Sequence, residues 1–123
     1  DRATLVTLAD GLGRGKQMLH KAPAAIVVCG DLDKALPRMR EYWVQDCSAA
    51  TQNILLAAEA LGLGAVWCGI YPNPEPVAFA RKVLGLPERI VPLNIIPVGY
   101  PAGSFKPKDK WKPENLRWQK WQE

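Results

Sequence analysis

The stretch that decides how this chain is interpreted is Ala65-Val66-Trp67-Cys68-Gly69-Ile70-Tyr71-Pro72. Its apolar residues predict a buried strand over 65–70, and Gly69 and Pro72 mark the turn into which that strand runs. A helix rich in small residues precedes the strand and ends in Leu61-Gly62-Leu63-Gly64. Because glycine has no Cβ, a strand that leads into a glycine-containing loop lets the backbone approach a flat ligand closely.

Helical and strand patterns alternate along the rest of the chain. We expect a short helix over 4–9, a further helical turn over 16–21, a strand over 24–29, a long helix over 43–61, a helix from Pro74 to Gly85 and a strand over 93–98. The run over 24–29 is continuously apolar, which is typical of a strand buried on both faces. Residues 31–40 contain Pro37 and mixed charges and predict a loop. Pro97 predicts an edge or a bulge, because proline cannot donate to a strand ladder.

The long helix has a slim apolar face. Its members recur at steps of three and four residues and are Cys47, Ala50, Ile54, Ala57, Ala58 and Leu61. The many alanines would permit close packing in a core or at a subunit interface. Helices that alternate with apolar strands predict a single mixed α/β or α+β sandwich. Three strands make an incomplete sheet, so we expect the remainder to come from sequence outside this chain or from a second subunit.

Composition narrows the functional classes. The chain has 123 residues, of which 48% are apolar, as in an ordinary globular domain. It holds no apolar run long enough to span a bilayer and no charged-then-apolar leader, which predicts a cytoplasmic protein that binds no membrane. Cys29, Cys47 and Cys68 fit no zinc spacing, and His20 is the one histidine, so we expect free thiols and no metal.

No arrangement of side chains in the sequence predicts acid–base or nucleophilic catalysis. There is no Ser/His/Asp set and no phosphate-binding glycine motif; Gly11-Leu12-Gly13-Arg14-Gly15 follows no buried strand and predicts a flexible turn. We therefore assign no catalytic side chain. Such an absence is expected where a cofactor performs the chemistry and the protein binds and orients it.

Several ordered segments resemble the FMN-dependent nitroreductase family. They are Trp43–Ala58, Leu61–Pro72, Leu84-Gly85-Leu86-Pro87, Ile96–Pro101 and the Lys- and Pro-rich tail over 100–123. The resemblance covers essentially the whole chain. The Arg-x-Ser motif and the Pro-Ser segment with which the family opens do not occur, and residues 1–10 resemble the helix that follows them. The chain thus resembles a nitroreductase domain over 1–123 without its amino-terminal third.

The resemblance implies a homodimeric α+β flavoprotein with a three-layer sandwich, a mixed central sheet flanked by helices, and an extended C-terminal arm. FMN would lie at the subunit interface and carry electrons from NAD(P)H to a nitroaromatic, quinone or similar small acceptor. Cys68, Gly69 and Ile70 would lie against the flavin ring, mainly through their backbone. Lys108 and Lys110 would neutralise the FMN phosphate, although the family often has arginine where Lys110 stands.

The tail gives rise to the other interpretations. The resemblance implies that Trp111, Trp118 and Trp121 belong to an arm that wraps around a partner subunit, and tryptophan suits such an interface because it buries a large area. From residue 103 onward the tail also carries +3 of the net charge of +4, which is consistent with a nucleic-acid-binding module. That charge is modest and confined to one arm, so we predict no nucleic-acid partner. A flavin-free structural or scavenging relative is the further alternative, and the missing amino-terminal motifs support it.

Overall fold

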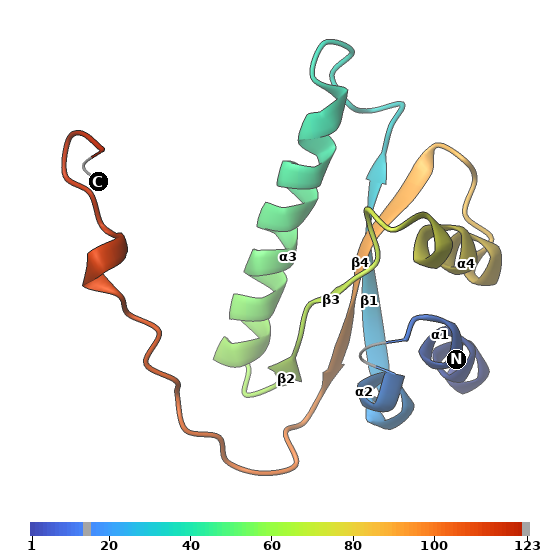
Figure 1. Ribbon diagram of the computed structural model, residues 1–123. Coiled ribbons are helices and arrows are strands. Elements are labelled where there is room, and N and C mark those ends of the chain that lie inside the picture. The colour runs from blue at the N-terminus through green and yellow to red at the C-terminus, as the bar shows by residue number, and fades with distance from the viewer. Residues whose placement is uncertain (14–15, 122–123) are drawn as a thin grey trace.

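The computed structural model describes residues 1–13 and 16–121 (Figure 1). Arg14 and Gly15 of the predicted glycine-rich turn therefore lie outside the described residues. The helices are α1 (Arg2–Gly11), α2 (Lys16–Lys21), α3 (Trp43–Ala60) and α4 (Pro74–Leu84), with single 3₁₀ turns at Arg40–Tyr42 and Pro113–Asn115. The strands are β1 (Ala24–Asp31), β2 (Gly64–Ala65), β3 (Cys68–Gly69) and β4 (Ile90–Gly99).

The elements form three layers around β4. This strand pairs with β1 on one side and with β2 and β3 on the other. Helix α3 covers one face of the sheet, while α1, α2 and α4 cover the other (Figure 1). The predicted α+β class and the three-layer sandwich are confirmed. In place of a mixed sheet, every strand pair within the described residues is antiparallel.

Two expectations about the strands were wrong. Pro97 was expected at an edge or a bulge, but its strand is central and buried, and Ile95 and Ile96 are 1% and 0% exposed. The register shift between β1 and β4 lies at Val28 and Cys29, whereas Pro97 pairs regularly with Ala25. Strand β1, which was expected to be buried on both faces, instead lies at the outside of the described sheet, and Ile26 is 43% exposed. Both strands are apolar runs, and an apolar run alone does not say which of two strands has neighbours on both sides.

The predicted strand over 65–70 is divided into β2 and β3. Both pieces pair with β4 in one continuous register, with Ala65 opposite Val98 and Cys68 opposite Ile95. The two residues between them, Val66 and Trp67, would therefore stand opposite Pro97 and Ile96. Because Pro97 has no N–H to donate, the ladder is interrupted at this point. Pro97 thus leaves its own strand, β4, continuous and divides the strand opposite it into β2 and β3.

Helix α3 begins at Trp43 as predicted and ends at Ala60, one residue earlier than predicted, and its buried face is turned relative to the prediction. Cys47 and Ala58 are buried as expected, whereas Ala50 and Ala57 are exposed, and Leu61 just beyond the helix is 73% exposed. The other buried residues of the helix are Trp43 and Thr51. The large Trp43 ring packs on the sheet and fixes the rotation of the helix, which a set of alanines cannot do.

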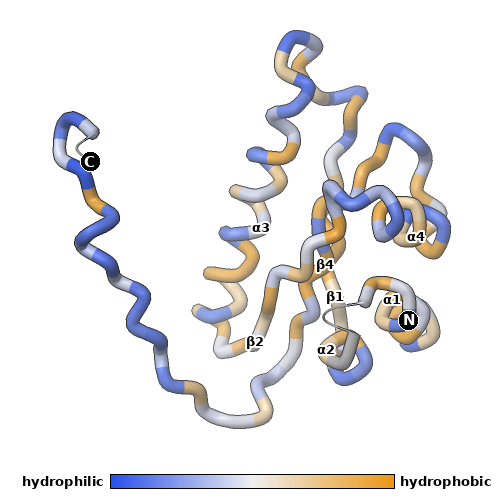
Figure 2. The backbone as a smooth tube through the Cα atoms, in the orientation of Figure 1, coloured by the Kyte–Doolittle hydropathy of each residue, from blue (hydrophilic) through white to orange (hydrophobic). Residues whose placement is uncertain are grey.

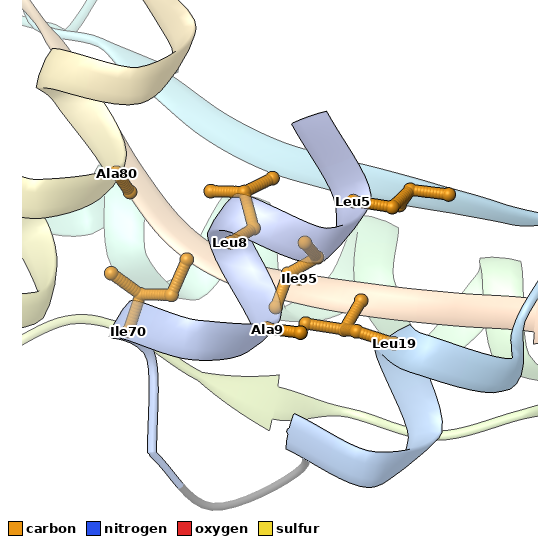
Figure 3. Packing of buried hydrophobic residues seen from close by; sticks show 7 residues of the cluster. All are labelled: Leu5, Leu8, Ala9, Leu19, Ile70, Ala80 and Ile95. Carbon is orange, nitrogen blue, oxygen red and sulfur yellow. The ribbon is translucent and has the colours of Figure 1, made fainter. Parts of the chain in front are cut away.

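The second face of the sheet carries the main apolar cluster. Its buried members come from α1, α2, α4, β4 and the residue that follows β3, and they are Leu5, Leu8, Ala9, Leu19, Ile70, Ala80 and Ile95 (Figure 3). Helix α4 begins and ends as predicted: the side chain of Asn73 accepts a hydrogen bond from the Glu75 N–H, and Gly85 adopts a left-handed conformation with φ 63°. The helix predicted over 4–9 spans Arg2–Gly11. Its start is earlier because the Asp1 side chain accepts a hydrogen bond from the Thr4 N–H and caps the helix.

The tail from residue 100 to residue 121 is extended and exposed, as expected. It leaves the end of β4 and runs away from the sheet (Figure 1), and it is largely hydrophilic (Figure 2). Trp111, Trp118 and Trp121 are 69%, 82% and 78% exposed. Within the described residues, no helix is long and apolar enough to cross a membrane.

Candidate functional site

The segment from Cys68 to Tyr71 is fixed by the central strand. Cys68 and Gly69 stand opposite Ile95 and Asn94, and the N–H groups of Ile70 and Tyr71 both donate to the carbonyl oxygen of Leu93 at 3.0 Å. In an antiparallel ladder, residues whose N–H faces the partner strand alternate with residues whose N–H faces away. Since the Ile70 N–H faces β4, the Gly69 N–H points away from β4, at the edge of the described sheet.

Neither the packing nor the backbone of the described residues requires a glycine at position 69. A Cβ built at this position meets no atom of residues 1–13 or 16–121 within 4 Å, and the backbone is not in the left-handed region. Gly30 differs, because a Cβ there would lie 2.3 Å from Cε3 of Trp43. The open space, the exposed backbone and the outward N–H together form a place where a flat ligand could lie against Gly69. The residues present therefore fit a planar cofactor.

The side chains on either side of Gly69 point into the core. Ile70 is 2% exposed within the main apolar cluster, and Cys68 packs partly buried against the same cluster. Burial raises the pKa of the Cys68 thiol, so this side chain stays protonated at neutral pH and is a weak nucleophile. The N–H of Ile70 is bonded to Leu93 and is not free for a ligand. Of the three predicted ring-binding residues, Gly69 has the most available backbone.

An aromatic contact lies at the end of this segment. Trp43, the first residue of α3, packs over Gly30 of β1 and meets the Tyr71 ring edge to face, with centroids 4.9 Å apart. Trp43 is 9% exposed and Tyr71 39%. Sequence reasoning did not identify this contact, although each residue lies in a segment that it singled out. The contact ties the start of α3 to the residues that follow Gly69.

A buried polar pair lies beside Gly69 on the α3 side of the sheet. Nδ2 of Asn94 donates to Oγ1 of Thr51 at 2.7 Å, and that hydroxyl donates to the Cys47 carbonyl oxygen at 2.7 Å. Asn94 and Thr51 are both 0% exposed. Sequence reasoning missed the pair; the one available signal was an asparagine inside an apolar strand.

The two predicted phosphate-binding residues lie elsewhere in the single chain. Lys108 and Lys110 are exposed in the tail, which runs away from β3 (Figure 1). The chain by itself therefore does not bring these lysines to Cys68, Gly69 and Ile70. Within the described part of the chain, no three metal-ligating side chains come together.

Comparison with known proteins gives consistent matches. The model of the nitroreductase family matches residues 3–100. A protein of Methanothermobacter thermautotrophicus named "Putative NADH dehydrogenase/NAD(P)H nitroreductase" is 46% identical over 104 residues, which are 85% of this chain and 53% of that protein. This chain thus spans about half the length of that relative.

Solved structures match over nearly the whole chain. A protein of the same name from Parabacteroides distasonis is 47% identical, with a TM-score of 0.90 over 98% of this chain and 69% of that chain. An FMN-dependent nitroreductase from Clostridium difficile is 26% identical, with a TM-score of 0.87 over 98% of this chain and 72% of that chain.

Proposed function

Because this chain belongs to the nitroreductase family, we propose that it is part of an oxidoreductase that binds FMN and passes electrons from NAD(P)H to a small electron-poor acceptor, such as a nitroaromatic or a quinone. The observation that carries the proposal is Gly69, where open space and an outward N–H coincide at a glycine that the chain's own packing does not require. The names of the relatives, which include NAD(P)H and FMN, support it.

FMN, when bound, would supply the hydride chemistry, and this chain would bind and orient it. Gly69 would allow close approach and could donate its N–H to negative charge that builds on the ring. Cys68 and Ile70 would hold Gly69 in place, because their side chains are fixed in the core. The protonated Cys68 thiol would not compete as a nucleophile.

We place Lys108 and Lys110 at the FMN phosphate of a neighbouring subunit in a homodimer. The tail runs away from its own Gly69, so its lysines are free to reach another copy. The exposed tryptophans of the tail and the exposed Leu56 of α3, at 59%, provide apolar surface for such an association. Each ammonium group would act as a point charge on the phosphate. The free thiols of Cys29, Cys47 and Cys68 fit a cytoplasmic protein.

A fluorescence titration tests cofactor binding. Bound flavin is detected by quenching, and FMN is compared with riboflavin, which lacks the phosphate. We expect FMN to bind at least tenfold more tightly than riboflavin. The same titration on a version that carries the family's Arg-x-Ser amino-terminal segment measures what that segment adds. If neither version binds FMN, the protein is a flavin-free relative and the proposal is wrong.

A further inference from the structure

The hydrogen bond between Thr51 and Asn94 joins the helix layer to the central strand. Asn94 lies on β4 and Thr51 on α3, and 43 positions separate them in sequence. The Thr51 hydroxyl continues the chain of hydrogen bonds to the carbonyl of Cys47, one turn earlier in α3. Because neither side chain is exposed, the bond fixes the position of α3 relative to β4 without competition from water.

Asn94 is also the register partner of Gly69. Residues directly opposite one another in an antiparallel pair carry their side chains on the same face, with Cβ atoms roughly 5 Å apart. The Asn94 side chain points toward α3, so the position that a Gly69 side chain would occupy faces α3 as well. The open space at Gly69 therefore lies beside the point where Asn94 holds the helix.

Stability alone does not account for this pair. Asn94 stands between Leu93 and Ile95, both almost fully buried, and its Oδ1 atom has no hydrogen-bond partner among the described residues. A buried acceptor without a partner is unfavourable, and an apolar pair of similar volume is often as stable as a buried polar one. A polar pair kept in an apolar layer suggests a requirement for one particular arrangement of α3 and β4.

We propose that Asn94 is a positioning residue that acts through Thr51 to set the space between α3 and Gly69 in which the cofactor ring lies. The inference rests on the proposed function. Trp43 and Tyr71 hold the start of α3 in the same way, eight residues before Thr51 or about 12 Å along the helix. Two tethers, one polar and one aromatic, thus fix the helix alongside the segment that contains Gly69.

Paired variants separate positioning from stability. T51S keeps the hydroxyl, whereas T51V/N94L replaces both members of the pair by apolar side chains. The melting temperature, the dissociation constant for FMN and the absorption spectrum of bound FMN are measured for each. We expect T51S to bind FMN within twofold of the wild type. We expect T51V/N94L to keep or raise the melting temperature, to bind FMN about tenfold more weakly and to shift the flavin absorption bands.

The variant L8V provides a matched control. Leu8 is buried on the opposite face of the sheet, so L8V should lower the melting temperature and leave FMN affinity unchanged. If T51V/N94L binds FMN with wild-type affinity and spectrum, the positioning role is wrong and the proposed function stands. If T51V/N94L does not fold, the pair serves stability and the inference is also wrong. If FMN binds neither the wild type nor the version that carries the Arg-x-Ser segment, both the proposed function and the inference fall.

Discussion

Replacing Gly69 by valine should separate cofactor binding from folding. A Cβ at this position meets no atom within 4 Å in the part of the chain that the structure describes, and the backbone conformation is open to any residue. Removing glycine from a compatible position reduces the entropy of the unfolded chain, so G69V should leave the free energy of unfolding unchanged or raise it by about 0.4–1 kcal/mol. The folded protein should therefore accept the substitution.

The same side chain should obstruct a ring that lies against Gly69. The oxidised ring is neutral, and leaving a buried hydrogen-bonding group without its partner costs about 1–3 kcal/mol, where each 1.4 kcal/mol corresponds to a factor of about ten. The dissociation constant for FMN should thus rise by roughly 10- to 100-fold in G69V, with a smaller rise in G69A. Quenching of FMN fluorescence measures binding, and thermal unfolding followed by circular dichroism measures stability.

A matched control is G103V. Gly103 also has no atom within 4 Å of a built Cβ, but it lies in the exposed tail. This variant should bind FMN within twofold of the wild type. Full flavin occupancy and an unchanged dissociation constant in G69V would refute the reasoning, because the open space at Gly69 would then not be where the ring lies.

Four further predictions follow from the geometry and the charges. K108E/K110E should weaken FMN binding at least tenfold at low salt and leave riboflavin binding unchanged. An equal loss of affinity for FMN and for riboflavin would show that these lysines do not bind the phosphate. G30A should lower the free energy of unfolding by about 1–3 kcal/mol in a denaturant titration, because the new Cβ would overlap Trp43, and wild-type stability would contradict the contact. Burial raises the pKa of the Cys29, Cys47 and Cys68 thiols above the ordinary value of 9.0, so the folded state favours their protonated form. The free energy of unfolding should therefore keep this contribution below pH 9 and should fall as the pH rises through the raised pKa values. A free energy of unfolding that increases over that range in denaturant titrations would contradict this. A chain that ends at residue 102 should sediment as a monomer in analytical ultracentrifugation, whereas the full chain should sediment as a dimer. A shortened chain that still has twice its monomer mass would exclude the tail as the dimer arm.

The sequence predicted most helices and strands, but it did not predict which strand lies beside which in the sheet. The helices over Trp43–Ala60 and Pro74–Leu84 were predictable because small-residue periodicity, Asn73 with Pro74 and Gly85 are local signals. The central position of β4 was not predictable, since its apolar run resembles that of β1. The break between β2 and β3 was hidden because its cause, Pro97, lies some thirty positions away in the neighbouring strand.

The candidate site was predictable to a similar extent. Gly69 was identified from its place after an apolar run and from the resemblance to the nitroreductase family, and the open space around it is a property that only coordinates reveal. The Thr51–Asn94 bond joins residues distant in sequence, and no local pattern predicts it. The assignments of Cys68, Gly69 and Ile70 to the flavin ring and of Lys108 and Lys110 to its phosphate all remain predictions. The tail of one chain does not approach its own Gly69.

The absorption spectrum of the purified protein with FMN, recorded before and after anaerobic addition of NADH or NADPH, tests the central claim most directly. The account predicts a bound-flavin band in the visible region that bleaches with at least one of the two donors and returns when a quinone or nitroaromatic acceptor is added. A flavin band that neither donor bleaches would contradict it, as would the absence of retained flavin both in this chain and in the version that carries the Arg-x-Ser segment.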